Sequence, residues 1–275
     1  YGYQVHKDLL NRLRPQYNIC PSIVMEEERQ QSPLEGLSEE ALKHVHQLDE
    51  PIPIELQASY FRLSAEMRRR GIQLSENEVQ DAEQLLFDPV LSDDIKKMTL
   101  LRLAITGNIT VFRIIERYLE SAPDSMRPWA LMAQLEARIG ILSDLVDEKQ
   151  LVITSGLGGH DGMMRFMAFL HTDKLQDFEH YQEELIEKEL LYRIGKASGE
   201  VERLEMHNNY LLLTFLVPIN YDLRNFFSSF IAECNQFGHF LSTTFIITNT
   251  QLLTPQGAQV ALKKYAEEND LPATN

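Results

Sequence analysis

The sequence is poor in cysteine, glycine and proline, and it has no long apolar run. Its only cysteines, Cys20 and Cys234, are too few for a disulfide framework in 275 residues, so both are expected to be reduced thiols. Thirteen glycines and eleven prolines are too few for a low-complexity chain. No stretch approaches the about 20 apolar residues of a membrane-spanning helix, and no charged-then-apolar leader opens the chain. We expect a globular cytoplasmic protein, although a sequence that begins at Tyr1 says nothing of any segment before it.

Basic residues are also scarce, with 26 lysines and arginines against 41 acids and a net charge of −15. Such a surface repels nucleic-acid phosphates and anionic lipid headgroups. The one tight basic run, Arg68 to Arg70, precedes Gly71 at the end of an expected helix, where cations complement the helix dipole. We therefore predict neither nucleic acid nor a membrane surface as a partner.

The hydrophobic period changes once along the chain. It is helical from Ser38 to about Leu145 and close to two from Leu151 onward. This change predicts an α+β protein of two domains, with the boundary between Leu142 and Leu151 and no strands within 40–140. The predicted parts are an N-terminal arm (1–35), a helical domain (36–148) and an α+β domain with a C-terminal helix (149–275).

The helical domain reads as a series of short helices separated by Gly, Pro and capping residues. Ser92 and Thr110 are expected N-caps, and Phe87, Ile95 and Met98 belong to the apolar stripes that should face the core. The short connections imply antiparallel neighbours. The expected helices are 38–48, 54–70, 75–88, 92–106, 110–122 and 125–142.

The rhythm of the stretch from Ile95 to Ile139 resembles HEAT-type helix pairs. The residues that carry the resemblance are Leu100, Leu101, Leu103, Ala104 and Gly107, followed by Phe112, Ile115 and Leu119. The resemblance implies stacked helical hairpins with one exposed binding face. A plain helical bundle produces a similar pattern, so both arrangements stay open.

The second half alternates strands and helices. From Met163 the order is βαββαβ, which resembles the ferredoxin-like fold with both helices on one face of an antiparallel sheet. The first and third of these strands are the most apolar, as the central strands of that fold should be, and the second carries edge-protecting charges. Expected strands are 151–155 (beside the first), 163–171, 200–207, 210–217 and 240–248; expected helices are 175–194, 222–236 and 255–268.

A glycine-rich stretch from Gly156 to Gly162 is the most conspicuous local feature. Bare backbone amides can cradle a phosphate, which makes this stretch a candidate ligand site. However, a strand and not a helix follows it, and the Lys-Ser/Thr of a phosphate-binding loop is missing. We predict a mobile hairpin loop without bound phosphate. The candidate ligand-binding residues are Gly156, Gly158, Gly159, His160 and Asp161.

No metal site, cofactor or catalytic group is predicted. His160 and Asp161 could begin a metal-dependent phosphohydrolase site, but the further ligands that a metal needs are not suitably arranged. The sequence contains no Gly-x-Ser-x-Gly elbow, no His-Glu-x-x-His and no Cys-x-x-Cys.

The two central strands of the predicted sheet are apolar on both faces. Two helices cover only one face, and an uncovered apolar patch of several hundred Å² is rarely tolerated in a monomer. The candidates to cover the second face are the helical half, the C-terminal helix with Val260, Leu262 and Tyr265, or a second copy of the chain, of which we favour a homodimer. The candidate interface residues are Met163, Met167, Phe169, Tyr210, Leu212 and Leu216.

These features together favour a non-enzymatic protein-interaction or scaffold protein that binds a protein partner or itself. The alternative is an enzyme or small-molecule sensor whose site lies between the two halves near the loop Gly156–Gly162. An enzyme needs a concave pocket with converging ionisable groups of shifted pKa, whereas a scaffold needs an apolar surface without them.

Overall fold

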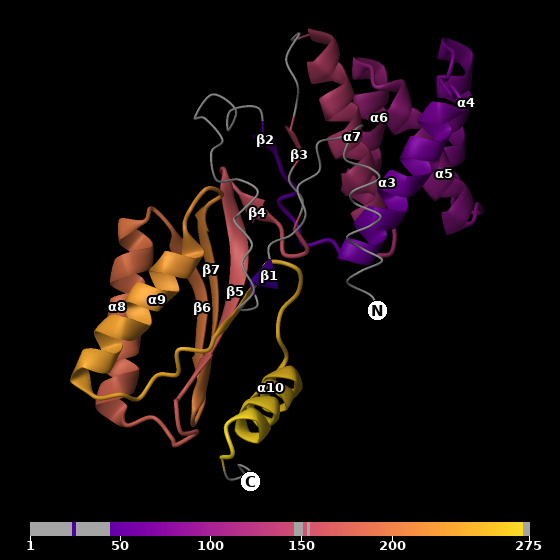
Figure 1. Cartoon of the computed structure of the whole chain (residues 1–275). Coiled ribbons are helices and arrows are strands. Elements are labelled where there is room, and N and C mark those ends of the chain that lie inside the picture. Colours follow the sequence, from indigo (N-terminus) through magenta and orange to yellow (C-terminus); the bar gives the residue numbers. More distant parts are fainter. Residues whose placement is uncertain (1–23, 26–44, 146–150, 153–154, 272–275) are drawn as a thin grey trace. The chain divides into compact units, whose positions relative to one another are not determined.

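The computed structural model describes residues 24–25, 45–145, 151–152 and 155–271 (Figure 1). They form an α+β protein, as predicted. The chain divides into two compact units. The helical unit contains 45–145, 151–152 and Ser155, and the sheet unit contains 24–25 and 156–271. The division falls after Ser155, later than the predicted interval, and two residues of the expected arm belong to the sheet unit.

Five helices lie in the described part of the helical unit, and local sequence signals set their ends. The Ser75 amide donates to the Glu78 carboxylate (2.8 Å) at the start of α4, a pairing that fixes the first turn. Gly107 ends α5 in the left-handed region (φ 60°). Asn108 then caps α6 by accepting from the Val111 amide (3.0 Å), so the cap is Asn108 and not Thr110. The helices are α3 (Ile54–Arg69), α4 (Glu76–Phe87), α5 (Asp93–Thr106), α6 (Ile109–Ser121) and α7 (Arg127–Leu145).

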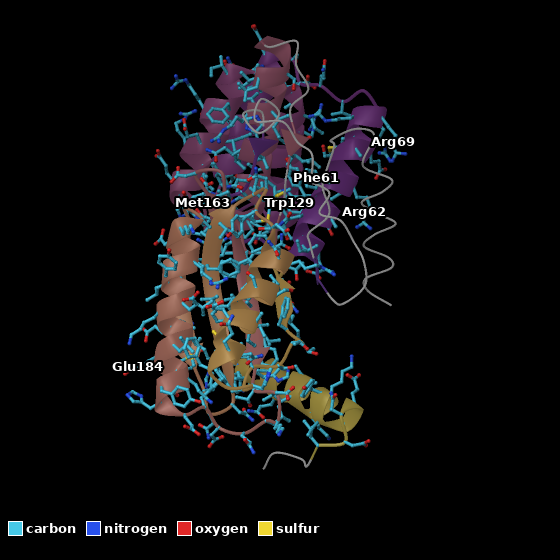
Figure 2. The ribbon with its side chains drawn as sticks, turned by 60° about the vertical axis from the view of Figure 1, so that its left-hand side comes forward. Phe61, Arg62, Arg69, Trp129, Met163 and Glu184 are labelled. Carbon is cyan, nitrogen blue, oxygen red and sulfur yellow. The ribbon has the colours of Figure 1, made fainter. Side chains whose placement is uncertain are left out.

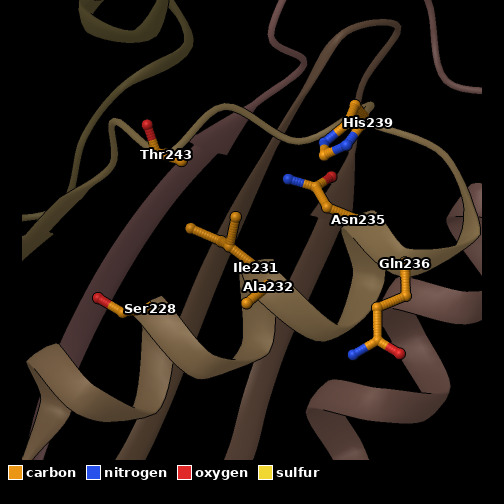
Figure 3. A pocket seen from close by; sticks show the side chains of 7 residues that line it. All are labelled: Ser228, Ile231, Ala232, Asn235, Gln236, His239 and Thr243. Atoms are coloured by element: carbon orange, nitrogen blue, oxygen red, sulfur yellow. The ribbon is translucent and has the colours of Figure 1, made fainter.

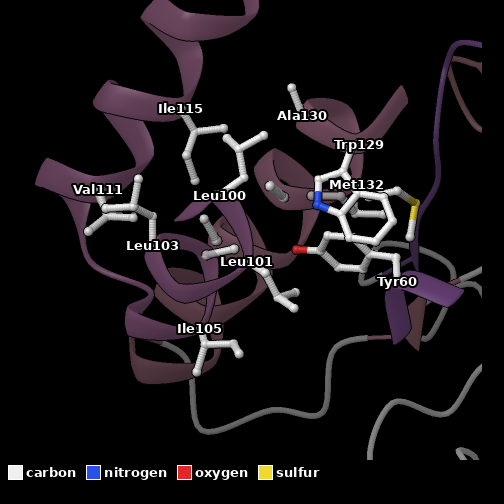
Figure 4. Close-up of a cluster of buried hydrophobic side chains, with 14 of the residues drawn as sticks. Tyr60, Leu100, Leu101, Leu103, Ile105, Val111, Ile115, Trp129, Ala130 and Met132 are labelled. Atoms are coloured by element: carbon white, nitrogen blue, oxygen red, sulfur yellow. The ribbon is translucent and has the colours of Figure 1, made fainter. Parts of the chain in front are cut away.

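The core of the helical unit lies around α5, which packs against each of the other four helices. Leu100, Leu101 and Leu103 of α5 are fully buried there (Figure 4). The Tyr60 ring meets the Trp129 ring edge-on, with centroids 5.1 Å apart. Phe61, labelled in Figure 2, is also buried. The buried apolar residues of the five helices form one contiguous core.

Two short strands, one before and one after the described helices of this unit, pair in parallel. Strand β2 (Val45–His46) pairs with β3 (Leu151–Val152). The expected helix 38–48 is therefore wrong at its C-terminal end, and there is a strand within 40–140. Of the expected strand 151–155, residues 151–152 pair with β2 in the helical unit and not with the main sheet. One physical reason is the buried Gln57 amide, which donates to the carbonyls of Ile52 (2.7 Å) and Ser155 (2.9 Å) and so ties both flanking segments to α3.

The sheet unit contains an antiparallel sheet with the strand order β1-β8-β5-β7-β6. Strand β4 is not in this row; it forms a hairpin with the first two residues of β5, Met163 and Met164. Strands β5 and β7 are central and β6 is an edge, as predicted. Along the chain the order of these elements is β5-α8-β6-β7-α9-β8. The strands are β1 (Val24–Met25), β4 (Gly159–His160), β5 (Met163–His171), β6 (Glu200–Met206), β7 (Tyr210–Pro218) and β8 (Ile246–Thr248).

Helices lie on both faces of this sheet. On one face lie α8 (His180–Lys196) and α9 (Leu223–Cys234), with the rings of Phe215 and Phe227 5.7 Å apart (Figure 1). After α9 come a short 3-10 helix, η1 (Asn235–Phe237), and an irregular segment that leads to β8. Helix α10 (Pro255–Glu268) packs on the second face. None of the helices in the described part of the chain combines the length and apolarity needed to cross a membrane.

Candidate functional site

The start of the glycine-rich stretch, residues 155–159, is buried and closely packed. The Asn249 carbonyl accepts from the amides of Gly156 (2.8 Å) and Leu157 (3.1 Å). A Cβ at Gly156 would lie 1.7 Å from the Thr250 carbonyl oxygen, and one at Gly159 would lie 2.2 Å from the Met163 carbonyl oxygen. These glycines are therefore required by close backbone approach, because any side chain would collide with a neighbouring strand. The loop that we predicted to be mobile is anchored here, and the absence of bound phosphate remains a prediction.

The end of the same stretch is a two-residue hairpin between β4 and β5. His160 pairs with Met163, and both Asp161 (φ 53°) and Gly162 (φ 74°) have positive φ. This is the requirement of a type I′ turn, for which Asp-Gly is a preferred sequence. The His160 imidazole lies 3.1 Å from the Asp161 carboxylate at the exposed tip. No cluster of three His, Cys, Asp or Glu that could hold a metal ion occurs among the described residues.

The second face of the sheet is covered by the chain's own C-terminal helix. Met167, Phe169, Tyr210 and Leu212 are all buried in one cluster with residues of α10. The α10 side chains in the cluster are Ala258, Leu262 and Ala266, with Ala261 and Tyr265 partly buried beside them. The expectation that something covers this face is therefore confirmed, and the cover is α10, although Val260 points to solvent with 70% exposure.

The remaining two candidate interface residues lie on the same face, on β5 and β7. Leu216 is fully buried and Met163 is partly exposed. Because α10 covers the part of this face that holds Phe169 and Leu212, the homodimer loses part of the observation that suggested it and stays an untested prediction.

A buried histidine lies where α10 meets the end of β5. The His171 ring nitrogen Nδ1 lies 2.9 Å from the Thr172 carbonyl, and its ring centroid is 4.2 Å from that of Tyr265. Burial lowers the pKa of His171, which opposes protonation, although Asp173 and the Thr172 carbonyl favour it. The Tyr265 hydroxyl in turn donates to the Asp173 carbonyl (3.2 Å). The neutral imidazole is thus part of the joint that holds α10 on the sheet.

The helical unit contains a buried carboxylate, Glu136 of α7, which is 3% exposed. It accepts from the Tyr60 hydroxyl (2.7 Å) and from Arg68 Nη2 (2.9 Å), and Ser64 also donates to it. Arg68, which we interpreted as a helix-capping cation, pairs with this carboxylate, whereas Arg69 is exposed (Figure 2). A carboxylate satisfied by three donors from α3 is suited to joining α3 to α7 and not to proton transfer.

Large exposed apolar side chains gather around the α4–α5 turn. We define the 85–98 surface by five residues whose exposed fractions range from 39% to 88%: Leu85, Phe87, Val90, Ile95 and Met98. The expectation that Phe87, Ile95 and Met98 face the core is wrong. The reason is that α5 carries apolar residues on more than one side, and Leu100, Leu101 and Leu103 occupy the core side. The Phe87 ring rests edge-on against Tyr118, with centroids 5.7 Å apart.

A cavity of about 580 Å³ lies in the sheet unit, between α9 and the segment that returns to β8 (Figure 3). We call it the α9 groove. His239 is the one ionisable residue among those that line it. The sequence predicts a strand over 240–248, but only Ile246–Thr248 form one, and the irregular segment before them borders the groove. The lining residues are Ser228, Ile231, Ala232, Asn235, Gln236, His239 and Thr243.

The cysteine that the structure describes is not a candidate nucleophile. Cys234 is buried and unpaired. Burial raises the pKa of its thiol to about 12, which keeps it protonated and unreactive. Cys20, the other cysteine, lies outside the described residues.

Comparison with known proteins adds no family to this picture. No family model matches the sequence, and no curated protein matches it. What the chain does must be argued from the chemistry of its own surfaces.

Proposed function

We propose that the chain is a non-enzymatic protein-interaction module and that the 85–98 surface is its docking site for a partner protein. The observation that carries the proposal is the exposure of five large apolar side chains within 14 residues, at the end of α4, in its connection to α5 and at the start of α5, led by Val90 at 88%. Grouped apolar residues of this kind mark interaction sites more often than chance exposure, because water contact with them is unfavourable.

The charges around the 85–98 surface indicate which kind of partner would bind it. Asp93 and Asp94 are exposed at the start of α5, next to the apolar residues. The whole chain carries a net charge of −15. A partner with two or three apolar anchors and flanking lysines or arginines would satisfy both features, since charge complementarity at the rim speeds and orients association.

Two observations favour binding over catalysis. The α9 groove has a single ionisable residue, His239, in its lining. The shifted pKa values of Glu50 and Arg127 follow from their mutual ion pair, and that of Cys234 follows from burial. The pKa shifts of His171 and Tyr265, whose rings lie 4.2 Å apart, are caused mainly by burial where α10 meets the sheet. Each of these shifts therefore has a structural cause.

The proposal includes the finer description of the two units. The helical unit would be a set of HEAT-like hairpins that presents the 85–98 surface, which the packing of α4 against α5 and α6 supports. The sheet unit would be a ferredoxin-like domain, which the strand order supports. A cytoplasmic location is part of the same proposal, and the buried unpaired thiol of Cys234 is compatible with it.

Quantitative affinity purification of the full chain from cells tests this function. We compare wild type with Val90→Asp and with Val260→Asp, a matched control in which another highly exposed valine, on α10, receives the same charge. A discrete set of proteins should be lost with Val90→Asp and retained with Val260→Asp. Identical protein sets from all three chains would contradict the proposal.

A further inference from the structure

The α9 groove has one wall that the structure holds firmly in place. The Asn235 side-chain oxygen accepts from the amides of Phe240 (3.1 Å) and Leu241 (2.9 Å), and its nitrogen donates to the Leu241 carbonyl (2.9 Å). The Ser242 amide donates to the His171 carbonyl (2.9 Å). These bonds hold residues 240–242 in an irregular path over the C-terminal half of α9, and the groove lies between that path and the helix (Figure 3).

The lining of the groove combines an apolar base with hydrogen-bonding groups at its sides. Ile231 and Ala232 supply the apolar surface. Ser228, His239 and Thr243 have side-chain donors or acceptors, and none of these three forms a side-chain hydrogen bond within the described part of the chain. No lysine, arginine, aspartate or glutamate is in the lining. A fully charged group would find no counter-charge here, so the lining favours an uncharged ligand.

The length and openness of the groove, and not its volume, favour a polypeptide over a small molecule. Ser228 and Gln236 line its two ends along α9 and η1, and eight residues of helix correspond to about 12 Å. That length fits three or four residues of extended chain. Most lining residues are solvent-exposed, so the groove is open along its length. A small molecule needs burial of about 70–90% of its surface, which an open groove does not provide.

We propose that the α9 groove is a second binding site, which takes an extended, uncharged polypeptide segment of a partner protein. The segment's backbone amides and carbonyls bond Ser228, His239 and Thr243, and its small apolar side chains pack on Ile231 and Ala232. This site is independent of the 85–98 surface, because it belongs to the other unit.

A phage-displayed library of random octapeptides, selected on the immobilised full chain, tests this site. Enriched sequences are then synthesised with capped ends, and their affinity is measured by fluorescence anisotropy. The groove variant is Ala232→Trp, which fills the groove from an exposed position on α9. The matched control is Gln259→Trp, which places the same side chain at an exposed position on α10.

The expected result is a peptide set without charged residues at the central positions. These peptides should lose at least tenfold in affinity on Ala232→Trp and bind Gln259→Trp and Val90→Asp like wild type. His239→Ala should also weaken them. Equal binding to Ala232→Trp, a set dominated by charged residues, or no enrichment would overturn the proposal. Small uncharged compounds that bind in an Ala232→Trp-sensitive manner, without any peptide doing so, would also overturn it. Loss of binding to Val90→Asp would assign the peptides to the 85–98 surface instead.

Discussion

The two units of this chain join their elements in different ways. In the helical unit, a buried carboxylate connects two helices through hydroxyl and guanidinium donors. In the sheet unit, α10 covers an apolar sheet face through alanine, leucine and tyrosine side chains. A polar joint is specific and costly to break, whereas an apolar cover weakens in proportion to the area removed. Each unit thus has its own internal joint, and the 85–98 surface and the α9 groove are exposed among the described residues of their own units.

The largest effect should come from the glycine at the start of the sheet unit. Gly156→Ala would place a Cβ 1.7 Å from the Thr250 carbonyl oxygen, so the backbone must move, at a cost of about 3 kcal/mol or more. Chemical denaturation followed by circular dichroism measures it. Gly195→Ala is the control: nothing lies within 4 Å of its Cβ in α8, and the helix should gain about 0.5–1 kcal/mol. Unchanged stability of Gly156→Ala would show that the loop is open and not anchored.

Removal of the buried carboxylate should have the next largest effect. Glu136→Ala deletes the acceptor shared by Tyr60, Ser64 and Arg68, and about 3 kcal/mol should be lost, limited because Arg68 is partly exposed. Trp129, the chain's single tryptophan, lies in the same core, so its fluorescence reports unfolding of the helical unit. Glu116→Ala, on the exposed side of α6, should change stability by less than about 0.5 kcal/mol. If both variants behave alike, Glu136 is not the joint.

Truncation of the α10 cover should have a graded effect. Leu262→Ala removes a side chain that is 1% exposed against the sheet, at a cost of about 2–3 kcal/mol. Val260→Ala, at 70% exposure on the same helix, should cost almost nothing. Urea denaturation compares the two. Light scattering on Leu262→Ala measures its oligomeric state. A dimer formed only by this variant would mean that a second copy of the chain replaces the loosened helix on the sheet face.

The smallest effect concerns pH. Burial holds the pKa of His171 below the about 6.5 of an unfolded chain, so the unfolded state binds a proton before the folded state does. Stability should therefore fall as pH drops below about 6.5, by at most about 1.4 kcal/mol per pH unit for this group. His171→Gln should flatten that dependence between pH 7 and 5. His180→Gln, at an exposed position of α8, should leave it unchanged; a flattening by both variants would remove the special role of His171.

Local signals in the sequence predicted much of the fold. Helix α5 begins after Ser92 and ends at Gly107, as expected. Such ends can be predicted because an N-cap and a left-handed glycine interact only with backbone groups a few positions away in the sequence. The βαββαβ order and the central strands followed from hydrophobic periodicity. The burial of Tyr210 and Leu212 by something on the second face could also be predicted, since apolar area must be covered.

The features that escaped prediction depend on long-range or competing contacts. Val45 pairs with Leu151 across a hundred residues, which no local pattern reveals. Residues 240–245 have strand-like composition, but the Asn235 side chain takes the backbone groups of Phe240 and Leu241 that a neighbouring strand would need. Both candidate sites lie where the sequence-based prediction was wrong. The α9 groove is bordered by residues predicted to form a strand, and the 85–98 surface contains apolar residues predicted to lie in the core.

The most direct test of the interaction account is a photo-crosslinker placed at single positions in the full chain within cells. A benzophenone amino acid replaces Val90 in one chain and Val260 in the other, both highly exposed. On irradiation, the account predicts discrete crosslinked products from position 90 that position 260 does not give, and their loss when Ile95→Asp is added. Equal products from both positions, or none from position 90, would contradict the central claim that the 85–98 surface docks a partner protein.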